Sequence, residues 1–310
     1  MHNHLLLHRY GSLLALSFFL ASCQLFNTDP TSIEYTDVDE LPGLIEGQMY
    51  MLIDDQMYSF SENGEEFEPV EWAANYPGMT HLALSHSKNK LAIVQDSNLV
   101  SIVSTRNGDL QEQRSLSANV NLIKWPKNDN YLTILSLDNS FSYLGGAPPS
   151  TFSIPQFLLD DFRILGFDMK STNHLCYSYS YKDERGTRYA IWFRDRDEEE
   201  SFLIGNLIMN DINLYTRRGT GIGIGTGVFP PRTNVCYDID FEQKELRFID
   251  SQTQFARGNN PNGFILFVDY DNLPQLHSIK VSFPSEPGAI TLWENDKELD
   301  EKDIIAEWKP

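Results

Sequence analysis

Apolar and polar residues alternate along most of this chain, in short runs that end at Asn, Asp, Gly or Ser. A period of two is typical of β-strands, because successive side chains of a strand point to opposite faces of a sheet. Runs with helical spacing are scarce, and turn residues recur between the apolar runs. The pattern therefore predicts an all-β chain of short strands joined by tight turns.

Three predicted hairpins repeat at one fixed spacing. They are YMLIDDQMYSF, AIVQDSNLVSI and ILSLDNSFSYL, and their turn aspartates are Asp54, Asp96 and Asp138. Consecutive aspartates of this set are 42 positions apart. A period of about 40–45 residues with four short strands per repeat is typical of β-propeller blades.

Three more hairpins follow at irregular spacing, in residues 175–195, 235–250 and 264–283. Six hairpins predict a β-propeller of about six blades over residues 43–310, with five and seven as alternative counts. We expect the segment AITLWEND, which starts at Ala289, to supply the strand that closes the ring. Tandem β-sandwiches are the alternative architecture, although they give no reason for a spacing that occurs twice.

A second feature recurs ahead of the hairpins: an apolar strand, a polar turn, and the strand that opens the next hairpin. Its copies begin at Leu82, Leu122 and Ile164. In the second copy, Trp125-Pro126-Lys127-Asn128-Asp129 resembles the W-S-P-D-G turn of Tol-system and WD-type propeller repeats. The signature glycine is missing from all three copies. The resemblance implies a propeller architecture and no particular activity.

The first 22 residues are predicted to be an export signal. Arg9 is their only fixed positive charge, and the apolar run Leu13–Ala21 is shorter than the ~20 residues that a membrane span needs. A membrane anchor of poor shape is the alternative. Leu20-Ala21-Ser22-Cys23 resembles the lipobox of bacterial lipoproteins. The resemblance implies cleavage before Cys23, a diacylglycerol on its sulfur, and a fatty acid such as palmitate on its amine.

The residues after Cys23 bear on where the protein is held. Several acyl chains on one residue give stable membrane anchoring, and Gln24 is not the aspartate that keeps enterobacterial lipoproteins at the inner membrane. The resemblance therefore implies a bacterial cell-envelope protein held in the membrane by its lipid, with the outer membrane favoured. Residues 23–42 are polar and acidic and predict a flexible tether. An irregular edge strand near Ile33–Tyr35 is the alternative.

The charge balance argues against one class of partner. The chain has 24 Lys and Arg against 44 Asp and Glu, a formal net charge of −20. Removal of the first 22 residues, which contain one arginine and no acid, makes it −21. Nucleic-acid binding is disfavoured, because phosphate backbones require Lys and Arg for neutralisation.

The segment RRGTGIGIGTGVFPP, residues 217–231, is the most unusual stretch. It matches neither nucleotide-binding glycine motif, and we predict no cofactor. Glycines that alternate with Ile222 and Ile224 fit a strand packed closely against another backbone. Arg217, Arg218 and Arg232 flank the segment. Guanidinium groups suit carboxylates and phosphates, so these arginines are the candidate binding residues for a protein or glycan partner.

Catalytic signals are weak. The histidines His81, His86, His174 and His277 lack metal-binding spacing, and no metal site is predicted. The run RDRDEEE, residues 194–200, reads as a solvated turn. The paired acids Asp238/Asp240 and Asp269/Asp271 each share a strand face, as catalytic carboxylates and ordinary surface acids both do. No residue is assigned a catalytic role.

The remaining candidates leave alternatives open. Cys176 and Cys236 are either bridged in an oxidising envelope or, as we favour, buried unpaired thiols. Trp72, Tyr76 and Trp125 either stack on sugars or fill the spaces between blades. The sequence favours a binding or scaffolding module. The alternative is a glycan-active enzyme with carboxylates in the central pocket of the propeller.

Overall fold

The computed structural model describes residues 48–53, 56–61, 68–147, 159–196, 198–214, 219–228, 234–250, 255–259, 265–271, 276–282, 289–295 and 304–309. All of these residues belong to one compact unit, Tyr35–Pro310. No helix in this part of the chain is long and apolar enough to cross a bilayer. The predicted signal (1–22), Cys23 and the tether (23–42) lie outside the described residues and stay predictions.

The described strands form six antiparallel sheets, numbered here in chain order. Sheet 1 contains β23 (Ile304–Lys309), β1 (Gln48–Ile53), β2 (Gln56–Ser61) and β3 (Glu68–Pro69). Sheet 2 contains β4 (Met79–Leu84), β5 (Lys90–Gln95), β6 (Leu99–Ser104) and β7 (Leu110–Ser115). Sheet 3 contains β8 (Val120–Lys124), β9 (Leu132–Ser136) and β10 (Phe141–Leu144).

The second half of the chain continues the same arrangement. Sheet 4 contains β11 (Asp160–Ser171), β12 (His174–Asp183), β13 (Gly186–Asp195) and β14 (Glu198–Leu203). Sheet 5 contains β15 (Leu207–Leu214), β16 (Thr220–Gly227), β17 (Asn234–Asp240) and β18 (Glu245–Asp250). Sheet 6 contains β19 (Phe255–Asn259), β20 (Ile265–Asp271), β21 (Leu276–Ser282) and β22 (Ala289–Asn295). All six predicted hairpins are present.

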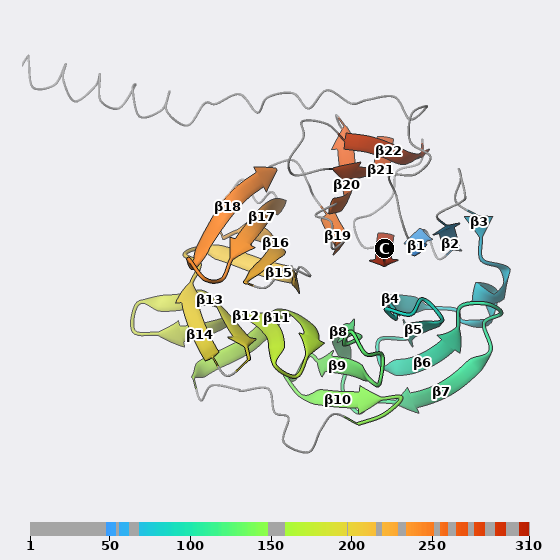
Figure 1. The fold of residues 1–310 in the computed structure, drawn as a ribbon, viewed down its shortest axis with the longest axis horizontal. Helices are drawn as coiled ribbons and strands as arrows, with labels where there is room; N and C mark the ends of the chain where they lie inside the picture. The colour runs from blue at the N-terminus through green and yellow to red at the C-terminus, as the bar shows by residue number, and fades with distance from the viewer. Residues whose placement is uncertain are drawn as a thin grey trace, which may run out of the picture. The chain divides into compact units, whose positions relative to one another are not determined.

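The first strand of each sheet contacts the first strand of the next, and the contacts return to their start. They run from β23 to β4, β8, β11, β15, β19 and back to β23. Figure 1 shows the sheets following one another around a common centre, with these strands innermost. The predicted β-propeller of about six blades is confirmed. Tandem β-sandwiches were the wrong alternative, because two sandwiches would not give one cycle of contacts.

The strand that closes the ring is not the predicted one. AITLWEND forms β22, the outermost strand of sheet 6. The closing strand is β23, which pairs with β1 from Gln48↔Lys309 to Ile53↔Ile304. Both C-terminal segments alternate apolar and polar residues, and such a pattern does not say which of them pairs with the N-terminal strand.

The apolar core lies between the sheets, in separate clusters. Tyr50 and Leu52 of sheet 1 pack with Leu84 and Ile93 of sheet 2, and similar clusters join sheets 2 and 3, 3 and 4, and 4 and 5. A fully buried Leu or Ile contributes about 1.5–3 kcal/mol. Sheets 1 to 5, whose side chains are described, therefore depend on their neighbours for burial, as the repeat predicted.

The turn that resembles the propeller motif joins two sheets. The Trp125 Nε1–H group donates a hydrogen bond of 3.0 Å to the Ala83 carbonyl oxygen. The Asp129 carboxylate accepts hydrogen bonds from the backbone N–H groups of His86 (2.7 Å) and Ser87 (2.6 Å). These contacts join residues that are 42 or 43 positions apart and lie in consecutive blades. The repeated spacing of 42 residues therefore equals the separation along the chain between equivalent places in neighbouring blades.

Candidate functional site

The predicted arginines are not placed by the structure. Arg217 and Arg218 fall in the connection before β16, and Arg232 falls in the connection after it, outside the described residues. The eight residues of β16 separate the two connections. The binding role of the three arginines stays a prediction.

The glycine-rich segment between these connections is a closely packed strand. At Gly223 an added Cβ atom would overlap the Met209 side chain, and at Gly225 it would lie 2.7 Å from the Leu207 side chain. Both neighbours belong to β15. The predicted strand is present, and at Gly221 an added Cβ atom would lie 2.7 Å from the Asn213 backbone oxygen, as predicted for packing against a backbone. At Gly223 and Gly225 the space is instead occupied by side chains of β15.

The other candidate acids lie away from the innermost strands. In the run 194–200, Arg194 pairs with Glu199, and Glu198, Glu199 and Glu200 are exposed as predicted, although they form the start of strand β14 and not a turn. Asp238 lies in β17, the third strand of sheet 5. Burial, and to a lesser extent Asp240, raise the pKa of Asp238, although Arg247 opposes them. The side chains of Asp269 and Asp271 are not among the described ones.

The candidate aromatic residues have structural roles. Trp125 is buried, and the Tyr76 hydroxyl donates a hydrogen bond of 2.7 Å to the Gly108 carbonyl oxygen. Trp72 packs edge-on against Tyr76. These contacts support the prediction that the three rings fill spaces between blades.

The cysteine and histidine side chains that the structure describes are buried or half-buried. Cys176 is a buried, unpaired thiol on β12, as predicted, while the side chain of Cys236 on β17 is not described. Among the histidines, His81 is half-buried, and its Nε2 atom lies 3.0 Å from the Asn121 carbonyl oxygen of β8. His86 and His174 are also half-buried, and the side chain of His277 is not described.

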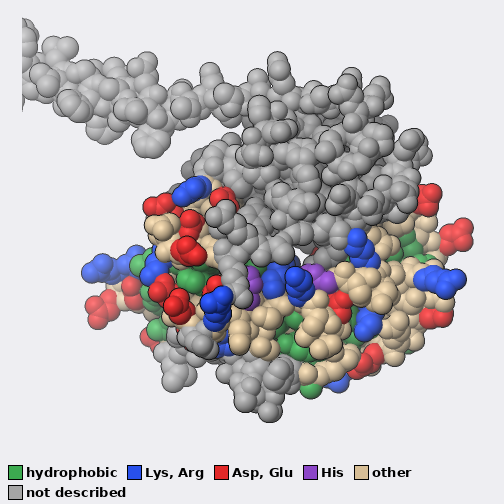
Figure 2. All heavy atoms as spheres, viewed as in Figure 1, with side chains coloured by type: hydrophobic (Ala, Val, Ile, Leu, Met, Phe, Trp, Pro, Cys, Tyr) green, Lys and Arg blue, Asp and Glu red, His purple; other side chains and the backbone are tan. Residues whose placement is uncertain are grey.

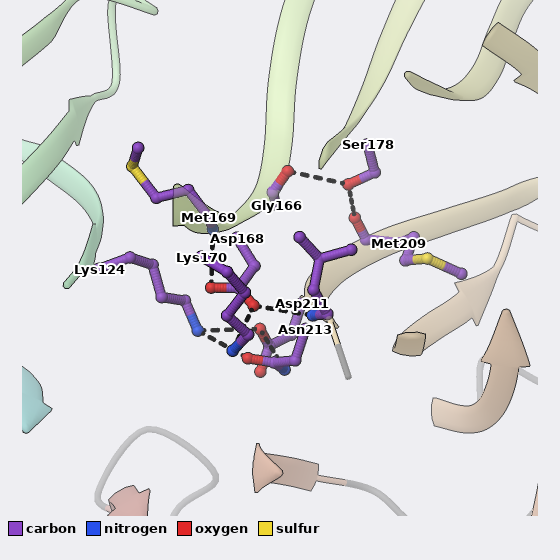
Figure 3. Close-up of polar contacts among 10 residues, drawn as sticks. Lys124, Gly166, Asp168, Met169, Lys170, Ser178, Met209, Asp211 and Asn213 are labelled. Atoms are coloured by element: carbon purple, nitrogen blue, oxygen red, sulfur yellow. Dashed lines mark hydrogen bonds and ion pairs between the residues drawn. The ribbon is translucent and has the colours of Figure 1, made fainter. Parts of the chain in front are cut away.

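Charged side chains of the innermost strands converge on one place that the sequence analysis did not identify. We define this inner-strand cluster by residues on four strands, namely Lys124 (β8), Asp168 and Lys170 (β11), Asp211 and Asn213 (β15), and Glu307 (β23). Figure 3 shows the side chains of Lys124, Asp168, Lys170, Asp211 and Asn213 pointing toward one another. Four blades therefore contribute to a single polar group.

Lys124 is held by polar atoms of sheet 5. Its Nζ atom donates a hydrogen bond of 2.9 Å to Asn213 Oδ1 and lies 3.8 Å from Asp211 Oδ1. The Asn213 amide in turn donates to Asp211 Oδ1 at 3.3 Å. The side chain of Lys124 is only 13% exposed. Sheets 3 and 5, which are not adjacent in the ring, are thereby connected.

Charge keeps Lys124 protonated. Burial by itself lowers the pKa of its ammonium group. The negative charges of Asp211, Glu307 and Asp168, in this order of size, outweigh burial, so the pKa is raised above its ordinary value. Lys124 is therefore a fixed cation rather than a proton donor or acceptor near neutral pH.

Asp168 connects sheets 4 and 5. Its carboxylate accepts hydrogen bonds from the backbone N–H groups of Leu214 (2.7 Å) and Met169 (2.8 Å). Lys170 Nζ lies 3.1 Å from the same carboxylate. The side chain of Asp168 is 5% exposed, whereas those of Lys170 and Asp211 are 21% and 22% exposed. Asp168 thus holds the cluster together, and Lys170 and Asp211 are the members open to solvent.

The backbones of β11 and β15 approach closely beside the cluster. The Ser178 hydroxyl donates a hydrogen bond of 2.6 Å to the Met209 carbonyl oxygen and lies 3.4 Å from the Gly166 carbonyl oxygen (Figure 3). A Cβ atom at Gly166 would come within 3.0 Å of the Asn210 carbonyl oxygen. Glycine at this position lets the two inner strands bring their charged residues together.

The cluster has the character of a recognition site. Its lysines are donors and its carboxylates and amide are acceptors, already fixed by bonds to the scaffold. In the part of the chain that the structure describes, no group of three or more His, Cys, Asp or Glu is arranged to hold a metal ion. The sequence signal was the spacing of two between Asp168 and Lys170, and between Asp211 and Asn213, within otherwise apolar strands.

Comparison with known proteins identifies the fold alone. No protein-family model matches the sequence, and no curated protein sequence does. Among solved structures, TolB from Acinetobacter baumannii is similar with a TM-score of 0.56 and 7% identity, over 85% of this chain and 67% of that protein. A protein described as TolB from Agrobacterium tumefaciens has a TM-score of 0.51 and 10% identity, over 86% of this chain and 100% of the other. The chain therefore shares the β-propeller fold with these two proteins.

Proposed function

We propose that the protein is a lipid-anchored binding module of the bacterial cell envelope, whose propeller holds a protein or glycan partner. The observation that carries the binding role is the inner-strand cluster. It presents charges of both signs, fixed in position by hydrogen bonds from several sheets. Preorganised polar groups of this kind favour recognition, because little ordering remains to be done when a partner binds.

The same geometry argues against the enzymatic alternative. A glycan-active enzyme needs one carboxylic acid that stays protonated to act as a general acid. Two of the three cluster carboxylates, Asp168 and Asp211, each lie within ion-pair distance of a lysine. Asp238, whose pKa is raised, lies on the third strand of its sheet. Binding is thus the function that the described site supports best.

The anchor is proposed from the sequence. The lipobox Leu20–Cys23 supports cleavage after Ser22, lipid on Cys23, and location in the outer membrane. We expect cells that are fed labelled palmitate to label the protein, and the Cys23→Ala variant to lose both the label and its membrane association. A membrane-bound Cys23→Ala protein without its leader would contradict the proposed anchor.

The partner is tested by cross-linking in intact envelopes, followed by mass spectrometry of the captured proteins. We expect Asp211→Asn to reduce capture of the partner by about tenfold, because a hydrogen bond to a charged group contributes about 1.5–3 kcal/mol. Asp183→Asn is the matched control, since Asp183 lies in the β12–β13 hairpin, away from the cluster. Equal capture by the two variants would contradict a binding role for the cluster.

The flanking arginines are tested in the same assay. Arg217, Arg218 and Arg232 are proposed to contact carboxylates or phosphates of the partner. We expect the double variant Arg217→Ala/Arg218→Ala to lose captured partner. If every detected interaction is unchanged in this variant, the arginines have no such role.

A further inference from the structure

Three turns next to the inner-strand cluster form one continuous surface. They connect the first and second strands of sheets 2, 3 and 4, at residues 85–89, 125–131 and 172–173. The first turn is bonded to the second through Asp129, which accepts from His86 and Ser87. The backbone N–H group of Lys127 donates to the Lys170 carbonyl oxygen at 2.9 Å, which joins the second turn to the end of β11. We call these turns and their flanking residues the inner-turn surface.

The inner-turn surface is basic, although the protein is strongly acidic. Across residues 85–90, 124–131 and 170–174 it carries five lysines, namely Lys88, Lys90, Lys124, Lys127 and Lys170. The acid in these segments is Asp129, whose two oxygens accept hydrogen bonds from backbone N–H groups. Lys124 and Lys170 pair with Asp211 and Asp168 of the inner-strand cluster, so Lys88, Lys90 and Lys127 are the lysines that this surface adds to it. Lys127 is exposed and Lys88 and Lys170 are half-buried. Figure 2 shows Lys, Arg and His side chains gathered around the middle of the visible face.

The turns at the opposite edge of the same sheets contain several exposed acids, together with Lys182 and Arg185 of sheet 4. The turns between the second and third strands contain Asp96 in sheet 2, Asp138 in sheet 3, and Asp183 with Glu184 in sheet 4, all exposed. Successive turns of an antiparallel sheet lie at alternate ends of its strands. Acids are not confined to that edge, because the β13–β14 turn is bonded to the third basic turn (Arg196 N–H to the Asn173 carbonyl oxygen, 2.7 Å) and is followed by the exposed Glu198, Glu199 and Glu200. The lysine-rich character therefore belongs to the innermost turns of these sheets and not to the whole face.

The N-terminal strand enters the propeller at the inner-turn surface. The Gln48 side-chain amide, at the first residue of β1, donates to the Tyr50 hydroxyl at 2.8 Å, and this hydroxyl lies 3.5 Å from the Thr105 carbonyl oxygen. The Thr105 hydroxyl donates to the Lys88 carbonyl oxygen at 2.8 Å, within the first basic turn. The start of β1 and the lysine-rich turns are therefore on the same side of the molecule.

We propose that the inner-turn surface faces the membrane and binds the phosphates of anionic phospholipid headgroups. The proposal rests on the proposed lipid anchor, because Cys23 lies 25 positions before Gln48. A flexible chain of this length has a root-mean-square span of about 25–30 Å, so the lipid keeps the basic face near headgroups. Acids on the far edge are screened, since charges act over about 8–10 Å at physiological salt.

The test uses the chain from residue 23 onward with Cys23→Ser, which contains every described strand and carries no lipid. Its sedimentation with phosphatidylglycerol vesicles is compared with that on phosphatidylcholine vesicles. We expect preferential binding to phosphatidylglycerol that weakens as salt is raised. The double variant Lys88→Glu/Lys127→Glu is expected to bind at least about tenfold more weakly, because each lysine near an anionic surface contributes roughly 1 kcal/mol.

The matched control is Lys182→Glu, an exposed lysine at the acidic edge of sheet 4. Thermal unfolding of each variant checks that the fold is kept. No preference for phosphatidylglycerol, or equal weakening by Lys182→Glu, would overturn the proposal. Displacement from the vesicles by polyglutamate at matched charge concentration would also overturn it, and would favour an acidic protein partner. None of these results bears on the anchor, which palmitate labelling tests separately.

Discussion

At the scale of single residues, polar side chains that bond to the backbone of the next sheet hold neighbouring blades together. Asp129 bonds sheet 3 to sheet 2, and Asp168 bonds sheet 4 to sheet 5. Asn139 bonds sheet 3 to sheet 4, because its amide donates to the Phe162 carbonyl oxygen and its oxygen accepts from the Ile164 N–H group. Such bonds fix the order and the register of blades whose apolar faces are similar.

We expect Asp129→Ala to lower the free energy of unfolding by about 2–4 kcal/mol. The variant loses two hydrogen bonds to a charged acceptor, each contributing about 1.5–3 kcal/mol, with partial replacement by water. Asp129 also has a φ of 53°, a conformation that Ala adopts less readily than Asp. Urea unfolding followed by tryptophan fluorescence measures the change.

The matched comparison is Asp129→Asn, which keeps one acceptor oxygen and tolerates the same backbone conformation. Its destabilisation should be about half that of Asp129→Ala. A stability equal to the unsubstituted protein in both variants would show that these bonds do not hold sheets 2 and 3 together.

Local sequence signals located only some of these residues. Trp125 and Asp129 lie in a turn with a recognisable motif, so the sequence singled out this turn, although not its hydrogen bonds to sheet 2. Lys124, Asp168 and Asp211 have no such motif. Their meeting depends on which strand of each sheet is innermost, and single-strand periodicity does not contain that information.

At the scale of elements, hairpins were predictable and ring closure was not. A hairpin needs two alternating runs and a tight turn, all within about 20 residues. The pair β23–β1 joins the two ends of the chain and has no local turn to mark it. The prediction therefore assigned closure to the segment AITLWEND, which starts at Ala289 and also has a strand pattern.

We expect a chain that stops after Asp303 to lose the closed ring. Removal of β23 takes away all six residue pairs with β1 and the buried Glu307. It also leaves β1 as an unprotected sheet edge, which favours aggregation. Size-exclusion chromatography and limited proteolysis should show aggregated or rapidly cleaved protein.

A chain that stops after Lys309 is the control, because it keeps every β23–β1 pair. This control should elute as a single peak from the size-exclusion column and should resist the protease. If the Asp303 truncation behaves like this control, β23 is not required for closure.

At the scale of the whole molecule, the core between blades contains many tyrosines whose pKa is raised. Burial raises the pKa of Tyr50 to about 12 despite the hydrogen bond to Thr105. Burial is also the main cause of a raised pKa in Tyr76, Tyr131, Tyr143, Tyr177, Tyr179 and Tyr237. The neutral phenols are therefore part of the native packing.

We expect stability to be complete below about pH 10 and to fall as pH rises toward 12. A raised native pKa means that the unfolded chain releases its phenol protons first, so alkali favours unfolding. Tyrosinate absorbance should rise at higher pH in the native protein than in the urea-unfolded chain. Coincident titration curves would contradict the burial of these rings.

The pairing of β1 with β23 has a consequence for how the protein is made. Among the described strands β1 comes first and β23 comes last, so sheet 1 is complete only when β23 has paired with β1. If the chain is exported as proposed, sheet 1 therefore stays incomplete until β23 has also crossed the membrane. Tension applied through the proposed anchor would then have to separate β1 from both β2 and β23.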